Sequence, residues 1–316
     1  MTREAPVAGH AGVCGVGRAL SRLAVVVLVA LVAAGCGGEN GPPRPDLALV
    51  SSRDGDYAIY VLDADGSRQT RLTEEGGNPE TRTGVDFQLD PAWSRDGRRI
   101  AFVSRRSGSL DVYVMNADGS DTRRLTSTRD EDRHPSFAPD GRQIAFQRGL
   151  GELFVAGLDG ERARRVTDDL AEESEPAWSP DGQWIAYVRR APGTSIREIW
   201  LVRPDGSGRR QLTKRRSTIY EPAWSPDGTR IAFASESPGR ILEIFEIRVD
   251  GTRLRKVTDS MEDTVEPAFA PDGTRIAFAR GGAIVIVDAD GEEQVLTSSS
   301  SNDSSPVWNP VPGPDE

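Results

Sequence analysis

Cysteine and histidine are scarce in this chain of 316 residues, which holds two of each. Cys14 lies in an N-terminal segment that we expect to be removed, so Cys36 would be the only thiol of the mature chain and no disulfide bond could form. His134 is the only histidine beyond that segment, which excludes histidine-rich metal sites. We therefore expect neither a bound metal nor a cofactor.

Catalytic motifs are missing as well. The sequence contains no Gly-x-Ser-x-Gly elbow, and a Ser-His-Asp triad would depend on His134 without any supporting motif. A pair of carboxylates could serve a glycosidase-like mechanism, but nothing in the sequence singles out two of the many. We expect a protein that is not an enzyme.

The chain also lacks an excess of basic residues. Its formal net charge is −10, and the first 35 residues carry three arginines and one glutamate, so the remainder stands at −12. Because nucleic acids are bound through basic surfaces, this balance excludes general nucleic-acid binding. The hydrophobic content of 37% is nevertheless sufficient for a large core.

The one long apolar run lies near the N-terminus. Two arginines precede the twelve apolar residues from Leu23 to Ala34, which is the pattern of a signal peptide and is too short to span a bilayer of about 30 Å. The segment Ala33-Ala34-Gly35-Cys36 resembles a bacterial lipobox, in which the cysteine is lipidated and becomes the first residue. We expect a lipoprotein signal peptide over residues 1–35, lipidation at Cys36 and a tether over 36–46. An uncleaved anchor or ordinary secretion is the alternative.

Internal repeats dominate the rest of the sequence. Each repeat reads approximately Pro-Ala-Trp-Ser-Pro-Asp-Gly, then Ile-Ala-Phe, then an apolar run closed by Asp-Gly, then Leu-Thr, and five complete copies begin at Pro91, Pro135, Pro176, Pro222 and Pro267. Successive copies are 39 to 46 residues apart, a period typical of propellers and solenoids. Short apolar runs separated by Asp-Gly turns indicate hairpins, so each repeat is predicted to be a four-stranded antiparallel sheet.

The sixth copy is divided between the two ends of the repeat region. The first strand-like segment, Leu47-Ala48-Leu49, has no opening phrase before it, and the missing phrase appears at the C-terminus as Pro306 to Pro310. Such complementary ends predict a closed ring, because a strand from one end covers the sheet edge left open at the other. The fold class is therefore an all-β, six-bladed propeller over residues 47–310, with a C-terminal strand completing blade one and a tail over 311–316.

Large aromatic residues recur at two positions of the repeat. Because each position is occupied in almost every copy, we interpret both columns as packing between blades and not as a ligand surface. One column is Trp93, Phe137, Trp178, Trp224, Phe269 and Trp308, and the other is Tyr60, Tyr113, Phe154, Trp200 and Phe245, with Val285 in the last copy.

The phrase Glu-Pro-Ala-Trp-Ser-Pro-Asp-Gly is complete at Glu175 and Glu221 and nearly so at Asp90 and Glu266. Together with Ile-Ala-Phe it resembles the WD40-like (PD40) repeat of the TolB propeller. The resemblance implies six blades closed by strand exchange. TolB itself carries an additional N-terminal α/β domain and works in the Tol-Pal envelope system. Prolyl-oligopeptidase-type peptidases combine related repeats with a hydrolase domain. We expect neither additional domain in this chain.

The loops are expected to differ between the two faces of the ring. Asp-Gly turns gather on one face, and loops of variable length gather on the other. From the threonine of each Leu-Thr pair the next repeat proline is nine residues away, except from Thr73, where it is eighteen residues away. The excess lies within Glu74 to Leu89, and it is either a functional loop or a tolerated insertion.

One residue precedes each repeat proline, and sixfold equivalence should place all six at one mouth of the channel. Four are acidic, and the six are Asp90, His134, Glu175, Glu221, Glu266 and Ser305. Such carboxylates could hold a cation, a basic peptide or an arginine of a partner. Alternatively, they pair with arginines such as Arg148, Arg189 and Arg280, or accept backbone hydrogen bonds.

These observations together predict a non-enzymatic, lipid-anchored extracytoplasmic propeller, in the periplasm or on the cell surface. Its expected partner is a protein or peptide of the cell envelope, bound at the channel mouth through Asp90, His134, Glu175, Glu221 and Glu266. The protein would contact the membrane through its lipid anchor and would be a monomer. The alternative is a carbohydrate-binding or carbohydrate-active propeller of the cell surface.

Overall fold

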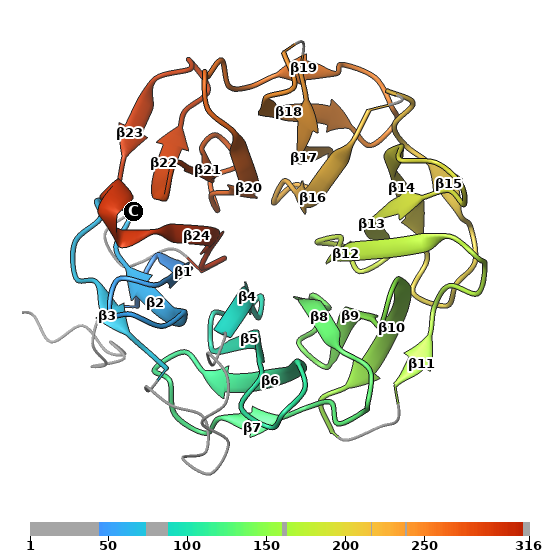
Figure 1. Cartoon of the computed structure of the whole chain (residues 1–316), viewed down its shortest axis with the longest axis horizontal. Helices are drawn as coiled ribbons and strands as arrows, with labels where there is room; N and C mark the ends of the chain where they lie inside the picture. Colours follow the sequence, from blue (N-terminus) through green and yellow to red (C-terminus); the bar gives the residue numbers. More distant parts are fainter. Residues whose placement is uncertain (1–43, 74–87, 160–162, 216, 238, 312–316) are drawn as a thin grey trace, which may run out of the picture. The chain divides into compact units, whose positions relative to one another are not determined.

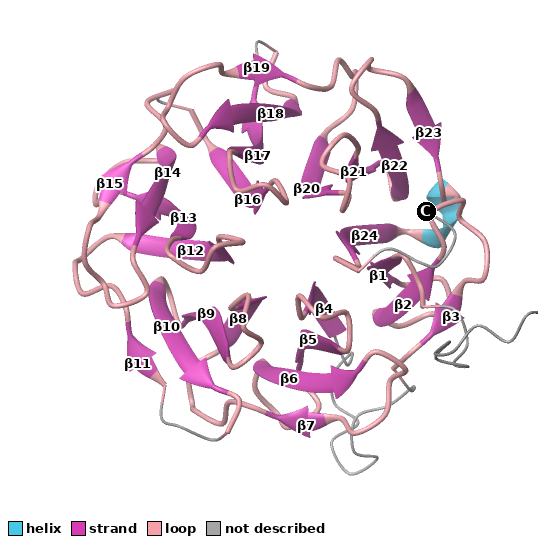
Figure 2. Cartoon of the chain, turned by 180° about the vertical axis from the view of Figure 1, so that it is seen from behind, coloured by secondary structure: helices cyan, strands magenta, loops and turns pink. Residues whose placement is uncertain are grey.

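The computed structural model describes residues 44–73, 88–159, 163–215, 217–237 and 239–311. All of them belong to one unit, Pro43–Glu316. Within it, 24 strands form six separate antiparallel sheets of four strands, arranged as blades around a central axis (Figure 1 and Figure 2). The described helical structure is one 3-10 turn, Ser299–Ser301. The predicted six-bladed propeller is confirmed.

Each blade has a long inner strand, two buried middle strands and a short outer strand. From the inside outward, blades 1 to 3 consist of β24 (Asp303–Trp308), β1 (Leu47–Ser51), β2 (Ala58–Leu62) and β3 (Thr70–Arg71); β4 (Gln88–Trp93), β5 (Arg99–Ser104), β6 (Asp111–Asn116) and β7 (Arg123–Arg124); and β8 (Asp132–Phe137), β9 (Gln143–Arg148), β10 (Glu152–Gly157) and β11 (Arg164–Arg165).

Blades 4 to 6 follow the same order. They consist of β12 (Glu172–Trp178), β13 (Ile185–Arg190), β14 (Arg197–Val202) and β15 (Arg210–Gln211); β16 (Ile219–Trp224), β17 (Arg230–Glu236), β18 (Leu242–Arg248) and β19 (Arg255–Lys256); and β20 (Thr264–Phe269), β21 (Ile276–Arg280), β22 (Ala283–Val287) and β23 (Glu293–Val295).

The Asp-Gly turns join the first strand of a blade to the second, and the third to the fourth. In blade 2 the amide of Gly97 donates to the carbonyl of Ser94 at 2.9 Å, and Gly97 adopts a φ of 63°. The Ser94 hydroxyl donates to the Asp96 carboxylate at 2.6 Å and accepts the amide of Arg99 at 2.9 Å. The Ser-x-Asp-Gly sequence therefore supplies both the backbone freedom and the polar side chains that this tight turn needs.

The ring closes as the divided repeat predicts. Strand β24, from the C-terminus, pairs antiparallel with β1, and Leu47 lies opposite Trp308. Beyond the strand, the Asn309 amide donates to the carbonyl of Asp46 at 2.7 Å. The Trp308 side chain is only 7% exposed and packs among buried residues of blades 1 and 6. Contacts between the two ends of the chain therefore hold blade 1 together.

The core consists of six hydrophobic clusters, one at each junction between neighbouring blades. Five members of the first aromatic column are at most 9% exposed, and Trp224 is half-buried with its indole N–H donating to the carbonyl of Ala177 at 2.9 Å. In the second column, Tyr113, Phe154 and Phe245 stack on a phenylalanine of the adjacent strand. Every member of both columns belongs to one of the six clusters, so the interpretation as packing between blades is confirmed.

Replacing Trp308 tests the closure. Trp308→Ala should lower the free energy of unfolding by about 3 to 5 kcal/mol, because it leaves a cavity at the junction of blades 6 and 1. Trp308→Phe is the matched control and should cost much less, since Phe137 and Phe269 occupy the same position in other blades and the Trp308 indole N–H has no hydrogen-bond partner among the residues that the structure describes. Urea denaturation of both variants measures the difference. Equal stability of Trp308→Ala and the wild type would contradict closure by β24.

Candidate functional site

The inner strand of every blade contains a bulge at the residue before the repeat proline. There the pairing register with the second strand shifts by one residue. All six residues at this position adopt a left-handed backbone conformation with φ between 51° and 59°: Asp90, His134, Glu175, Glu221, Glu266 and Ser305. We call these six residues the channel ring. Glutamate rarely adopts this conformation, so neighbouring contacts must compensate for its cost.

Carboxylates of the channel ring supply that compensation across the blade junctions. The acid of one blade accepts the backbone N–H of the ring residue in the next blade. The four bonds run from His134 to Asp90 at 3.3 Å, from Glu221 to Glu175 at 2.5 Å, from Glu266 to Glu221 at 2.6 Å and from Ser305 to Glu266 at 2.6 Å. The expectation that these acids accept backbone hydrogen bonds is confirmed.

Two of the six junctions lack this bond. The residues that precede Glu175 and Asp90 around the ring are His134 and Ser305, which have no carboxylate. Within the described residues, no side chain of the channel ring accepts the N–H of Glu175 or of Asp90. The four acids therefore account for the four closed junctions, and the two open N–H groups follow from the two residues that are not acids.

The alternative pairing with arginines is wrong for the three arginines proposed, although another arginine, Arg197, lies 3.9 Å from the Glu175 carboxylate. Arg148 forms a bidentate pair with the buried Asp132, at 2.7 and 2.9 Å, and its guanidinium lies 4.5 Å from the centre of the Phe154 ring. The other two also bind acids outside the ring: Arg189 contacts Asp169 at 2.9 Å, and Arg280 contacts Glu293 at 2.7 Å. These arginines stand at strand ends over aromatic rings, so they cover the core and do not face the channel.

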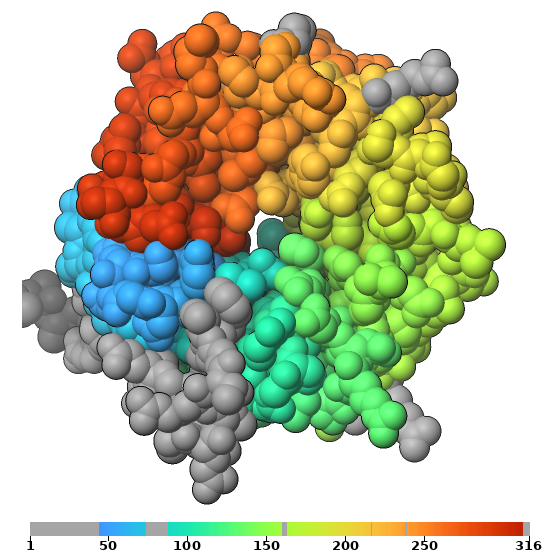
Figure 3. Space-filling model, viewed as in Figure 1, coloured from blue at the N-terminus to red at the C-terminus, as the bar shows by residue number. Residues whose placement is uncertain are grey.

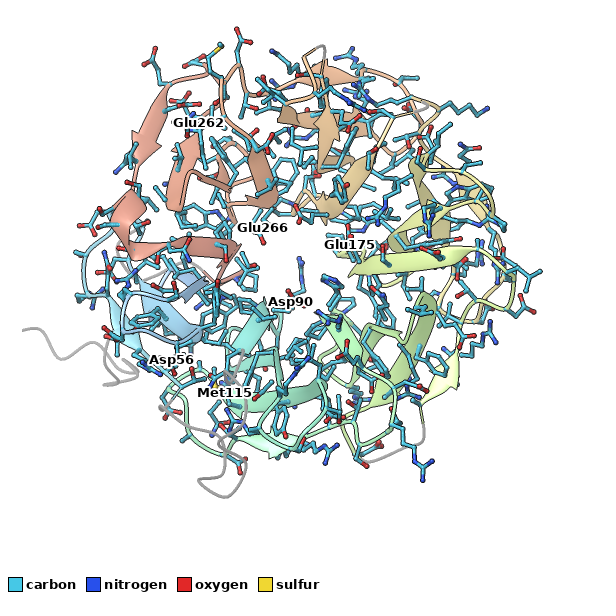
Figure 4. All side chains as sticks on the ribbon, in the orientation of Figure 1. Asp56, Asp90, Met115, Glu175, Glu262 and Glu266 are labelled. Atoms are coloured by element: carbon cyan, nitrogen blue, oxygen red, sulfur yellow. The ribbon has the colours of Figure 1, made fainter. Side chains whose placement is uncertain are left out.

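The channel ring lines a central cavity of about 480 Å³, which is large enough for a ligand or a peptide segment. Figure 3 shows the opening at the centre of the ring, and Figure 4 shows Asp90, Glu175 and Glu266 around it. The cavity extends from the channel ring toward the Asp-Gly turns. Its far end is lined by the second proline of five repeats and by Arg95 in the sixth: Pro139, Pro180, Pro226, Pro271 and Pro310. This rim was not predicted from the sequence, although four of its five prolines stand in Ser-Pro or Ala-Pro pairs that recur in the repeat.

All five residues predicted for the channel mouth line this one cavity. Burial raises the pKa of Glu221 well above its ordinary value, and the neighbouring carboxylates of Glu266 and Glu175 raise it further. Burial also raises the pKa of Glu266, against the opposing effect of the hydrogen bonds from Ser305. These two glutamates therefore keep their protons to a higher pH than free glutamates do.

Free acceptors remain in the cavity after the ring bonds are counted. Asp90 and Glu221 each use one carboxylate oxygen for a backbone N–H, and their second oxygens make no hydrogen bond among the described residues. The oxygen of Asp90 can receive an N–H group or a cationic side chain of a ligand, whereas that of Glu221 can do so only above the raised pKa of this residue. In the described part of the chain, no group of three or more His, Cys, Asp or Glu side chains is arranged to hold a metal ion.

Another acid, Glu173, is buried in blade 4 outside the cavity. Burial raises its pKa to about 7, partly offset by a hydrogen bond from Thr167. The Tyr187 hydroxyl is buried as well and has no hydrogen-bond partner in the described part of the chain. Burial, together with the nearby Glu173, raises its pKa. Nothing in the sequence signalled this pair, because Tyr187 occupies a phenylalanine position of the repeat.

Two predicted features fall outside the described residues. Cys36 and the signal peptide precede residue 44, and of the segment from Glu74 to Leu89 only Gln88 and Leu89 are described, as the start of β4. Where the structure describes the chain, no helix is long and apolar enough to cross a membrane.

The fold and the cavity define a closed, six-bladed propeller with an acidic ring in its channel. A family model described as the TolB beta propeller domain (PD40) matches residues 37–146, 82–195 and 192–312. The chain belongs to this family of TolB-like propellers, as its repeats predicted.

Individual relatives match over shorter stretches. The chain is 33% identical over 108 residues to the uncharacterized peptidase YuxL of Bacillus subtilis, covering 31% of this chain and 16% of the relative. It is 30% identical over 95 residues to the Tol-Pal system protein TolB of Francisella tularensis, covering 30% and 20%. The crystal structure of TolB from Acinetobacter baumannii matches with a TM-score of 0.72 at 22% identity, covering 84% and 66%. The matched stretches span a fifth or less of the two curated relatives, and the structural likeness shows the shared fold.

Substitutions of Glu221 separate its role as a hydrogen-bond acceptor from its ionisation. Glu221→Ala removes the acceptor of the Glu266 N–H and should lower the free energy of unfolding by about 1 kcal/mol or more. Glu221→Gln keeps an acceptor and removes the ionisable group. Because the pKa of Glu221 is higher in the folded protein than in the unfolded chain, the wild type loses stability as pH rises above the pKa of the unfolded state. Glu221→Gln has no such loss, so it should gain stability over the wild type at pH 8 but not at pH 4.

Thermal unfolding of the wild type and both variants at the two pH values provides the measurement. If Glu221→Gln and Glu221→Ala lose the same stability at both pH values, the carboxylate does not hold the blade junction.

Proposed function

We propose that the protein is a non-enzymatic, lipid-anchored propeller outside the cytoplasm that binds a protein or peptide of the cell envelope. The observation that carries this proposal is the acidic channel ring, whose five predicted residues all line one cavity. Its unused carboxylate oxygens favour a partner segment that carries a basic group. Asp90, His134, Glu175, Glu221 and Glu266 would contact this segment.

Exposed apolar side chains support a macromolecular partner. Leu150, Leu170 and Met261 are 90% exposed or more, and all three stand in loops on the face opposite the Asp-Gly turns. A protein that covered this face would remove them from water. The aromatic columns, by contrast, give little support to the carbohydrate alternative, since five of the six rings nearest the channel are at most 9% exposed and present only a small part of their surface to the cavity that they line.

Family membership favours the same assignment. One relative is a Tol-Pal system protein, and we extend an envelope role from it to this chain. Another relative is named as a peptidase, but the matched stretch covers 16% of it, and the described cavity contains no serine-histidine pair in hydrogen-bond contact. The proposal therefore assigns binding and not hydrolysis to the propeller.

Neutralising the channel ring tests partner binding. The double variant Asp90→Asn, Glu175→Gln keeps hydrogen-bond acceptors and removes two charges, so the fold should persist while partner capture weakens at least tenfold at low salt and less at high salt. Crosslinking pull-down from membranes, quantified by mass spectrometry, measures the capture. Asp121→Asn with Glu292→Gln is the matched control, because it removes the same two charges from exposed residues of the Asp-Gly turns, on the opposite face and outside the cavity. Equal capture by the channel variant and the control would contradict the proposal.

The anchor has its own test. Cys36→Ser removes the proposed acylation site and should leave the protein either soluble after cell lysis or with its leader uncut. Fractionation and intact-mass measurement distinguish these outcomes from the wild type, which should require detergent for extraction. Extraction of the wild type without detergent would show that Cys36 carries no lipid anchor.

A further inference from the structure

A second cavity, of about 220 Å³, lies at the junction of blades 3 and 4 on the loop face. His134 and Glu175 line both cavities, so the second one begins where the hydrogen-bonded channel ring is interrupted. Its wall is completed by residues at the ends of β9, β12, β13 and β14, among them Gln147, Arg190 and Arg197. Leu150, which is 94% exposed, stands at its edge. We call this space the junction pocket.

The junction pocket has one open hydrogen-bond donor. In four blades the N–H of the ring residue points to the preceding blade and is accepted by a carboxylate. Glu175 has the same register shift and a φ of 54°, so its N–H points toward His134 in the same way. The His134 imidazole is instead directed to Asp90, with Nδ1 and Oδ2 3.4 Å apart. The Glu175 N–H is therefore available to a ligand.

The pocket also has an open acceptor on Gln147, in addition to the Ser174 hydroxyl, which donates to the Glu175 carboxylate at 3.4 Å. The Gln147 amide nitrogen donates to the carbonyl of Gly149 at 3.3 Å, which fixes the orientation of the side chain. Its Oε1 atom is buried and accepts no hydrogen bond within the described residues. A buried polar atom without a partner costs free energy that a bound donor recovers.

The charges around the pocket are balanced. Arg190 forms an ion pair with Glu172, and Arg197 lies 3.9 Å from the Glu175 carboxylate with its guanidinium over the Tyr220 ring. With both acids and both bases paired, neither a cation nor an anion is favoured. The open donor and open acceptor instead suit a neutral group that offers one acceptor and one donor.

We propose that the junction pocket binds a carboxamide, the side chain of an asparagine or glutamine on the peptide partner. Its C=O accepts the N–H of Glu175, and its NH₂ donates to Oε1 of Gln147. The inference rests on the proposed function for the identity of the partner. The small volume admits a single side chain but no folded segment, and the partner surface around that side chain covers Leu150. Glu175 and Gln147 are then the residues that determine this specificity.

A small-molecule probe tests the pocket without the partner. Acetamide carries the required acceptor and donor, whereas acetate has the same shape without an N–H. In nitrogen-15 NMR titrations up to the order of hundreds of millimolar, the Glu175 backbone amide and the Gln147 side-chain amide should shift saturably with acetamide and not with acetate. Equal responses to both probes, or no response to acetamide because water alone fills the pocket, would overturn the inference.

A matched pair of variants makes the test specific. His134→Gln places a neutral acceptor next to the Glu175 N–H, as the acids do in other blades, so it should weaken the acetamide response at least tenfold without lowering the melting temperature. Ser305→Gln is the control, because it closes the other open junction, at Asp90, and does not line the junction pocket. It should leave the response unchanged. A full response in His134→Gln would contradict the proposed geometry.

The two proposals can fail separately. A wild type that captures an envelope protein but does not respond to acetamide would overturn the junction pocket and leave the proposed function in place. A specific acetamide response, together with partner capture that ignores the channel charges, would support the pocket and overturn the proposed role of the channel ring.

Discussion

The pairing of β24 with β1 is the contact on which the rest of the structure depends. It joins residues 250 and more positions apart in the sequence, buries Trp308 and completes blade 1. Without it, the two sheet edges on either side would be open to water and to other chains. The same closure brings one residue from each blade to the axis, so the site exists only because the ring is closed (Figure 1).

Once the ring is closed, the chemical type of each ring residue decides the state of the next blade. An acid accepts the neighbouring N–H and makes its left-handed backbone conformation tolerable, whereas His134 and Ser305 leave a donor open. The cost is a group of buried, crowded carboxylates: burial first, and the neighbouring carboxylates in addition, raise the pKa of Glu221 and Glu266. Structural and binding roles are therefore combined in the same residues, and Gln or Asn substitutions, which keep the acceptor, distinguish the two roles.

Much of this architecture could be predicted from the sequence, because a repeat reports the same local structure six times. The hairpins, the divided blade, the burial of Trp308 and the convergence of the ring residues all follow from the spacing of Asp-Gly pairs and prolines. The partners of Arg148 and Arg189 could not be predicted, since they depend on which acid a neighbouring strand end brings near. Nor could the open Gln147 oxygen, because its burial and the contact of its amide nitrogen with the Gly149 carbonyl depend on the folded loop and not on the repeat pattern.

Hydrogen exchange of the six ring amides is the most direct test of the central claim, that the acid of one blade holds the next. Measured by NMR on the whole protein, the amides of His134, Glu221, Glu266 and Ser305 should be protected. Those of Asp90 and Glu175 should exchange faster, because no ring carboxylate accepts them. Uniform protection of all six amides, or protection that does not follow the acids around the ring, would contradict the account.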